Sequence, residues 1–278
     1  MIIAVTGASG FIGRRLTERL RAEGHTVREI SLHRRAPIVP VCHAVVHLAG
    51  EPVAQRWTRS VRDRILKSRV EGTKSLVKAL SEHPPPVLVS ASAIGYYGSR
   101  GDEILTEASQ PGADFLAQVV IEWEREARSA EQFGIRVVPL RFGMVLGRGG
   151  GTLKKMLLPF RLGLGGRLGT GQQWMSWIHL DDLIALIGFA IESAQCKGVM
   201  NAVAPHPVTN AEFTHDLARA LHRPAVFPVP EFGLKLLYGE MSQVILGSQR
   251  VKPEAALKAG FEFRVAELGP ALRQILAN

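Results

Sequence analysis

The chain opens with Ile2-Ile3-Ala4-Val5-Thr6-Gly7-Ala8-Ser9-Gly10-Phe11-Ile12-Gly13, and the rest of the sequence is best understood from this segment. Its four leading apolar residues predict a strand buried on both faces, because such a strand has no polar side to show to water. Glycines follow at 7, 10 and 13, and apolar residues then recur with helical spacing at Ile12, Leu16 and Leu20. A strand, a glycine-rich turn and a helix in succession are typical of a dinucleotide site, where bare backbone approaches a pyrophosphate at a helix N-terminus.

The glycine spacing is G-x-x-G-x-x-G, one residue looser than the common G-x-G-x-x-G pattern. Glycines alone often mark only a tight turn, but their place between an apolar run and an amphipathic helix favours a cofactor site. The residues predicted to hold the cofactor here are Gly7, Ser9, Gly10, Phe11, Ile12 and Gly13.

The second predicted strand, Thr26 to Ile30, carries information on which dinucleotide binds. Enzymes that use NAD usually place a carboxylate at the end of this strand, whereas an arginine nearby accommodates the 2′-phosphate of NADP. Here the strand is followed by Ser31 and then by His33, Arg34 and Arg35, with no carboxylate. A solvated basic loop is the alternative interpretation, but we predict NADP(H), bound in part by these four residues.

A third apolar strand, Ala44-Val45-Val46-His47-Leu48-Ala49-Gly50, ends in small residues. Small side chains at a strand end let the backbone run against a flat ligand, so Leu48, Ala49 and Gly50 are predicted to line the cofactor.

Helices and strands alternate through the first 140 residues. Helices are predicted at Val61–Leu80 and Phe115–Glu131, and strands at Val87–Ser90 and Ile135–Leu140. This alternation predicts an α/β fold with a parallel, doubly wound sheet. Beyond it come glycine clusters at 147–151 and 163–171, and a tail with helices at 210–221, 253–259 and 266–276, which we interpret as a small lobe beside the sheet.

Composition excludes several classes of protein. With 278 residues, 46% hydrophobic and 21% charged, the chain is an ordinary globular one. No apolar run approaches the ~18 residues that a membrane helix needs, and no basic segment precedes the first strand, so we expect a cytoplasmic protein with no membrane association. Cys42 and Cys196 lack metal-ligand spacing. One disulfide between them is an alternative, but two reduced thiols are the simpler expectation, and no metal site is predicted.

The net charge is +9, from 34 Lys and Arg against 25 Asp and Glu. Basic residues are spread along the chain with no dense run, so nucleic-acid binding is a weaker interpretation than binding of a small anionic molecule. Singly, each basic residue in the glycine-rich region is best explained as solvated surface. As a group they are candidates for holding an anionic substrate through phosphate contacts: Arg148, Lys154, Lys155, Arg161, Arg167 and Arg250.

Several segments together resemble the short-chain dehydrogenase/reductase superfamily in its extended, sugar-nucleotide-epimerase-like form. They are Thr6–Gly13, His47–Gly50, Ser90-Ala91-Ser92-Ala93-Ile94-Gly95-Tyr96-Tyr97-Gly98, Leu140-Arg141 and Trp177-Ile178-His179-Leu180-Asp181-Asp182. The sequence is most similar to a branch called "epimerase family protein", through Leu48–Pro52, Leu157–Gly166 and Gly247–Val251. The resemblance implies a Rossmann domain over residues 1–150, to which 177–204 return, and a C-terminal α/β substrate lobe made of 151–176 and 205–278. It allows a homodimer, with no interface fixed by the sequence.

One departure from this superfamily concerns the chemistry. Its members carry a Tyr-x-x-x-Lys pair on the helix after the serine-bearing strand, where the Tyr exchanges the proton during hydride transfer. The segment 112–127 contains neither Tyr nor Lys. Ser92 matches the usual serine. The proton would come from Ser92, Tyr96 or Tyr97, or from water, although either tyrosine could equally be a packed loop aromatic. His179 is expected to be structural.

Two functions therefore stand side by side. The first is an atypical NADP(H)-dependent reductase or epimerase-like enzyme acting on a small, anionic substrate. The second is a catalytically silent NADPH sensor or scaffold, which the missing Tyr and Lys motivate directly.

Overall fold

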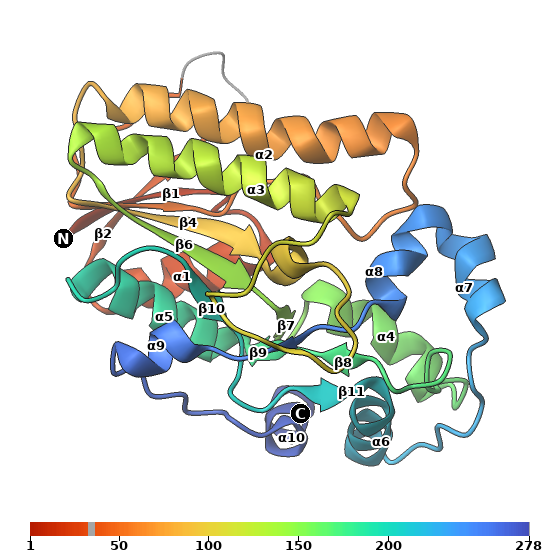
Figure 1. Cartoon of the computed structure of the whole chain (residues 1–278). Helices are drawn as coiled ribbons and strands as arrows, with labels where there is room; N and C mark the ends of the chain where they lie inside the picture. The colour runs from red at the N-terminus through yellow and green to blue at the C-terminus, as the bar shows by residue number, and fades with distance from the viewer. Residues whose placement is uncertain (33–36, 278) are drawn as a thin grey trace.

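The computed structural model describes residues 1–32 and 37–277, and a six-stranded parallel sheet forms its centre (Figure 1). The strand order is β10-β6-β4-β3-β1-β2. The strands are β1 (Ile2–Thr6), β2 (Thr26–Ile30), β3 (Ala44–His47), β4 (Val87–Ala93), β6 (Arg136–Phe142) and β10 (Met200–Ala202). The predicted parallel, doubly wound α/β fold is thus confirmed.

Helices cover both faces of this sheet, as alternating strands and helices require. One face is packed by α1 (Phe11–Ala22) and α5 (Leu180–Glu192), the other by α2 (Arg59–Leu80) and α3 (Phe115–Arg128) (Figure 1). The central strands β1, β3 and β4 are almost wholly buried, and α5 contributes seven apolar residues to the core on its face of the sheet. This explains why these strands are continuous apolar runs rather than alternating ones.

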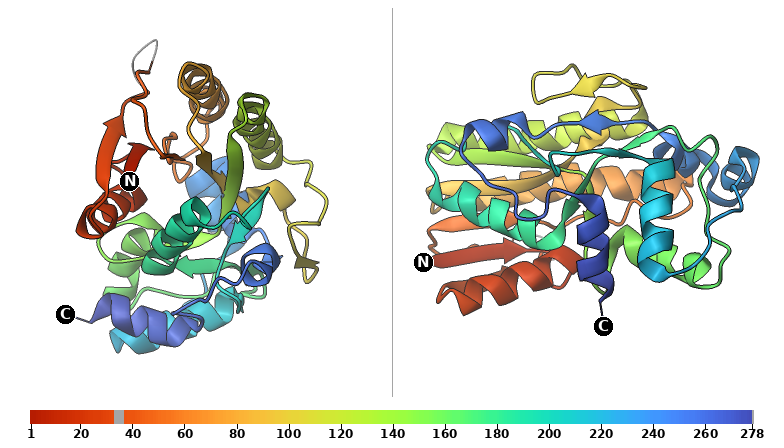
Figure 2. Two further views of the ribbon diagram at one scale, coloured as in Figure 1. Left: turned by 90° about the vertical axis from the view of Figure 1, so that its left-hand side faces the viewer. Right: turned by 90° about the horizontal axis from the view of Figure 1, so that it is seen from below.

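The C-terminal part of the chain packs on the α5 side of the sheet (Figure 2). A separate core, with Trp177, Phe213 and Leu272 at its centre, joins its helices α4 (Gly151–Arg161), α6 (Asn210–Leu221) and α10 (Leu268–Leu276). Three small two-stranded sheets complete the fold. They pair β7 (Met144–Leu146) with β9 (Trp177–His179), β8 (Trp174–Met175) with β11 (Val208–Thr209), and β12 (Arg250–Val251) with β5 (Ile104–Leu105), the last of which ties the tail to the segment after β4.

Sequence periodicity placed most elements within two or three residues. β4 and β6 run further than predicted, to Ala93 and Phe142, and α3 ends at Arg128 before a short 3₁₀ turn over Ser129–Phe133. In the tail, the helices α7 (Glu231–Tyr238) and α8 (Ser242–Leu246) and the 3₁₀ turn between them were not predicted, nor was the 3₁₀ turn Ile94–Tyr97 after β4. The tail also holds α9 (Glu254–Lys258).

Cys42 and Cys196 are both free and lie buried in two different core clusters, so the expectation of two thiols without a disulfide is confirmed. Within residues 1–32 and 37–277, every helix is too short or too polar to cross a bilayer.

Candidate functional site

The connections after β1 and β3 leave the sheet on opposite sides, because α1 covers one face and α2 the other. In open parallel sheets, ligands bind at such a point, outside the carboxyl ends of the two strands. The residues predicted to bind the cofactor from these two strands meet there: the Gly7–Gly13 turn after β1, and Leu48, Ala49 and Gly50 after β3.

Close packing explains the glycines at 7 and 13. Gly7 has a φ of +70°, and a Cβ atom on it would lie 2.8 Å from the backbone nitrogen of Ala49. A Cβ atom on Gly13 would lie 2.2 Å from the carbonyl oxygen of Gly7. No side chain fits at either position, so α1 starts directly against the strand end. Ser9 and Gly10 are exposed there, which leaves backbone and the helix N-terminus open to an anion.

A buried histidine fixes the two sides of this crevice to each other. The imidazole Nδ1 of His47 lies 2.7 Å from the Thr6 hydroxyl, and its Nε2 lies 2.9 Å from the Thr73 hydroxyl on α2. The Thr6 hydroxyl also accepts hydrogen bonds from the backbone N–H groups of Leu48 and Ala49. Burial, together with the nearby Arg69 charge, lowers the pKa of His47 to about 4, so the ring is neutral at physiological pH.

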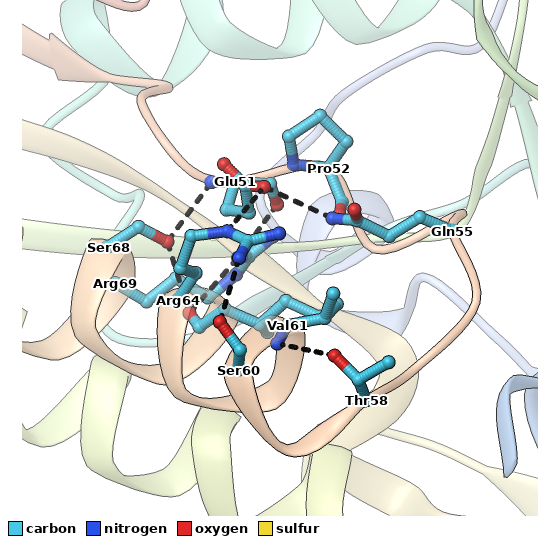
Figure 3. Close-up of polar contacts among 10 residues, drawn as sticks. Glu51, Pro52, Gln55, Thr58, Ser60, Val61, Arg64, Ser68 and Arg69 are labelled. Carbon is cyan, nitrogen blue, oxygen red and sulfur yellow. Dashed lines mark hydrogen bonds and ion pairs between the residues drawn. The ribbon is translucent and has the colours of Figure 1, made fainter.

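The segment after Gly50 is held against α2 by hydrogen bonds (Figure 3). The backbone N–H of Glu51 donates to Ser68 Oγ at 3.0 Å, and its carbonyl oxygen accepts from Arg69 Nη1 at 3.0 Å. The Glu51 carboxylate accepts from Gln55 Nε2 and Arg64 Nε. The Leu48–Pro52 motif therefore serves to fix the loop that borders the crevice.

Close packing also explains three glycines of the cluster at 147–151. The ring of Phe11, the first residue of α1, lies against Gly147, Gly150 and Gly151. A Cβ atom on Gly150 would come within 2.2 Å of that ring. Phe11 thus connects the first glycine turn to the start of α4, across the two parts of the fold.

Ser92 stands at the end of β4 inside a buried polar network. Its hydroxyl donates to Glu124 Oε1 on α3 at 2.6 Å, and Arg141 on β6 donates to both oxygens of the same carboxylate. Burial lowers the pKa of Arg141, but its hydrogen bonds and charge pairing with Glu124 outweigh burial, so the pKa is raised overall. Ser92 is 3% exposed.

The two tyrosines after β4 have different surroundings. Tyr97 is fully buried, and its hydroxyl donates to Asn201 Oδ1 at 2.7 Å and accepts from Arg141 Nη1. Burial raises the pKa of Tyr97 to about 12. Tyr96 is half-buried, with the Arg141 guanidinium 3.3 Å from the centre of its ring.

A cavity of about 750 Å³ opens beside this region, between the start of α3 and the α7–α8 segment. Gly95 and Gly98 border it on the β4 side, and Leu116 lies on the α3 side. Trp57 and Phe115 form an edge-to-face pair in its wall, 5.4 Å between ring centres. Its two basic residues each face an acid, Arg62 with Glu240 at 2.9 Å and Lys235 with Glu231 at 3.9 Å. This mixed lining suits a small molecule of modest polarity.

The remaining predicted residues lie elsewhere. Arg148, Lys154 and Arg161 are exposed and, like Arg250, do not border the 750 Å³ cavity as far as the structure describes the chain. The guanidinium of Arg250 instead lies 4.2 Å from the centre of the Trp174 ring. Ser31 is exposed just after β2, while His33, Arg34 and Arg35 fall outside the described residues. Their binding roles stay predictions.

His179 has the structural role expected of it. It is the N-cap of α5, where its Nδ1 accepts a hydrogen bond from the backbone N–H of Asp181. Sequence reasoning missed Glu124, Asn201 and Trp57 as parts of the site, because their partners lie far away along the chain. The sequence signal available for Glu124 was its place three residues beyond the apolar stretch Val119–Ile121 in a predicted helix.

Comparison with known proteins agrees with this geometry. Residues 3–202 match the model of the NAD dependent epimerase/dehydratase family, and residues 229–275 match a domain of unknown function, DUF1731. The sequence is 41% identical to the chloroplastic epimerase family protein SDR39U1 homolog of Arabidopsis thaliana, over 99% of this chain and 87% of that protein. It is 38% identical to the epimerase family protein YfhF of Bacillus subtilis, over 100% and 99%. Among solved structures, human epimerase family protein SDR39U1 (isoform 2) with NADPH superposes with a TM-score of 0.93 at 37% identity, covering both chains completely.

Proposed function

The chain belongs to the NAD dependent epimerase/dehydratase family, and on that premise we propose that it is an NADPH-dependent oxidoreductase acting on a small molecule. The observation that carries the proposal is the cradle at Gly7 and Gly13, where neither glycine tolerates a Cβ atom and the helix N-terminus is open. Such a cradle fits a pyrophosphate. The match to a structure described as containing NADPH supports the choice of cofactor.

The residues that would hold the cofactor are the Gly7–Gly13 turn and the Leu48–Gly50 segment, with Arg34 and Arg35 near the 2′-phosphate. When bound, NADPH supplies a hydride for a carbonyl carbon and leaves as NADP⁺. The substrate would occupy the 750 Å³ cavity, whose described lining includes Gly95 and Gly98, on either side of the two tyrosines, but not Ser92, Tyr96 or Tyr97 themselves. An anionic substrate and a homodimer both remain predictions.

We assign the proton to Tyr96. Reduction of a carbonyl needs one proton on the oxygen, and Tyr96 is the less buried of the two tyrosines. The Tyr97 hydroxyl already has two partners in the buried network. The Arg141 guanidinium over the Tyr96 ring would stabilise the negative charge left on the phenol oxygen.

The direct test measures NADPH affinity by fluorescence titration, and then hydride transfer from deuterium-labelled NADPH to a panel of aldehydes and ketones. We expect transfer of the label to product, and a large loss of rate in Tyr96→Phe. An unchanged rate in that variant would remove Tyr96 as the proton donor.

A separate experiment tests the choice of cofactor. Changing Arg34 and Arg35 to Ala is expected to weaken the binding of NADPH much more than that of NADH.

The second candidate is a silent NADPH sensor or scaffold. The observation in its favour is that α3, with the sequence FLAQVVIEWEREAR, carries neither Tyr nor Lys. A protein of this kind would bind NADPH tightly and transfer no deuterium from labelled NADPH to any acceptor. Deuterium found in even one product would exclude this second candidate.

A further inference from the structure

The C-terminal lobe contains a second hollow of about 530 Å³, between one face of α6, the segment 223–228 and Arg167. None of the residues that line this α6 hollow also lines the 750 Å³ cavity. Its volume lies in the range of small-molecule sites, about 300 to 1,000 Å³. The hollow is thus large enough for a ligand of its own.

One wall is a stripe along α6. The residues in it are Ala211, Thr214, His215, Ala218 and Arg219, whose three- and four-residue spacing puts them on one side of the helix. Two of the five are alanines, which leave room beside the longer side chains.

The opposite wall is fixed at both ends. The chain turns after α6 at His222, which has a φ of 52°, and Arg223 N–H then donates to the Ala218 carbonyl. At the other end, Val229 N–H donates to the Arg167 carbonyl at 2.8 Å. A Cβ atom on Gly166 would lie 1.6 Å from the Phe227 carbonyl oxygen, so only glycine permits this crossing. The wall therefore holds its shape without a ligand.

The charged side chains that line the α6 hollow are all basic. Three arginines line it, Arg167, Arg219 and Arg223, and no carboxylate does among the residues that the structure describes. All three arginines are exposed, and none of their guanidiniums has a hydrogen bond or an ion pair with another of residues 1–32 and 37–277. The nearest acids of α6 are turned elsewhere: Glu212 is used in the capping box with Thr209, and Asp216 lies beside Gly269 of α10. Uncompensated positive charge of this kind attracts an anion.

Thr214 belongs to the same stripe of α6 and is 5% exposed. Its Oγ1 has no hydrogen-bond partner within residues 1–32 and 37–277, but neighbouring atoms cover it, so a ligand in the hollow would contact the rest of this side chain.

We propose that the α6 hollow binds a small phosphate ester with an apolar body, of the size of a nucleoside monophosphate, at a site separate from the cofactor crevice. Guanidinium groups bind phosphate through paired hydrogen bonds, which accounts for the three arginines. The other side of the hollow, Pro224, Ala225, Val226 and Pro228, is apolar and would contact the body of the ligand. This proposal does not depend on the reaction at the 750 Å³ cavity.

The test is calorimetric titration of the full chain with AMP, pyrophosphate and adenosine, in saturating NADPH so that the Gly7–Gly13 turn is occupied. We expect AMP to bind and adenosine to bind at least tenfold more weakly. Arg219→Gln and Arg167→Gln should each weaken AMP about tenfold, since one charged hydrogen-bonding group is lost. The matched control is Arg128→Gln, an exposed arginine at the end of α3, which should leave AMP binding unchanged.

NADPH affinity, measured first on every variant, shows that each is folded. If NADPH itself fails to bind, the cofactor proposal fails, and the AMP titrations are run without it. The α6 hollow is overturned as a phosphate site if AMP and pyrophosphate give no heat, or if Arg219→Gln binds AMP as Arg128→Gln does. Binding of a single-stranded oligonucleotide with steep salt dependence, without binding of AMP, would make it a nucleic-acid surface instead and also overturn the proposal.

Discussion

The guanidinium of Arg141 on β6 donates to both carboxylate oxygens of Glu124 on α3, at 2.8 Å each, in a pair that is 3% and 8% exposed. The same carboxylate accepts from Ser92, and the same guanidinium donates to Tyr97. One ion pair thus connects β4, β6, α3 and the turn that holds both tyrosines. The helix α3, whose sequence contains neither Tyr nor Lys, is thus anchored to the sheet by a buried carboxylate.

Removing one partner of this pair should be strongly destabilising. Glu124→Gln leaves the Arg141 charge buried without its counter-charge, and such changes cost about 3–5 kcal/mol. Chemical denaturation should show a loss of that size in the free energy of unfolding. The matched control is Glu122→Gln on the same helix, whose carboxylate pairs with exposed Arg125 and should cost about 1 kcal/mol or less. Equal losses in the two variants would mean that the buried pair contributes little.

Tyr97→Phe should separate stability from rate. The variant leaves Asn201 Oδ1 without the donor it has at 2.7 Å, which should cost about 1–3 kcal/mol of unfolding free energy. Turnover per folded molecule should be unchanged, because the proton is assigned to Tyr96. Tyr238→Phe, at a half-buried tyrosine of α7, serves as the control and should be close to neutral. A large loss of turnover in Tyr97→Phe at full cofactor occupancy would mean that Tyr97, and not Tyr96, donates the proton.

His47 predicts a dependence of stability on pH. Its pKa is lowered from 6.5 to about 4 in the folded chain, so between these values the unfolded state binds a proton that the folded state does not. Stability contributed by this residue is therefore present above pH 6.5 and is lost as the pH falls toward 4. Between pH 7 and pH 5 the loss should be about 2 kcal/mol.

The measurement compares slopes rather than absolute stabilities, because His47→Gln also removes hydrogen bonds. Unfolding free energies of the wild type and of His47→Gln are followed from pH 7 to pH 5, and the variant should lose about 2 kcal/mol less over this range. His83→Asn, at an exposed histidine, should keep the wild-type slope. A wild-type slope in His47→Gln would show that another group is responsible.

Local signals in the sequence were sufficient for the sheet and for the glycine cradle. The apolar run of β1, the turn after it and the α1 periodicity all lie within twenty residues, so no long-range contact was needed to predict them. The helix predicted at 210–221 is found at these bounds as α6, and a capping box of Thr209 and Glu212 fixes its start.

The rest of the site depends on contacts between distant residues. Arg141 was visible as a motif, but its pairing with Glu124, and that of Tyr97 with Asn201 104 residues away, are set by strand order and not by neighbours. The helix α7 was missed for a physical reason as well: it exposes Phe232, Leu236 and Leu237, so its apolar residues do not form the inward stripe by which a surface helix is detected. Its place beside the cavity could not be predicted without the tertiary fold.

The cofactor cradle gives the sharpest prediction for binding. In Gly13→Ala the new methyl group would meet the carbonyl oxygen of Gly7 at 2.2 Å and Ala8 Cα at 2.7 Å, and since both are backbone atoms, α1 must move away from β1. Fluorescence titration should then show at least tenfold weaker NADPH binding, as overpacking of this kind costs about 1–3 kcal/mol. Gly188→Ala is the control, because that helical glycine has open space around it and alanine should stabilise α5 by up to about 1 kcal/mol without affecting NADPH. Wild-type NADPH affinity in Gly13→Ala would mean that the cofactor does not bind at the Gly7–Gly13 turn.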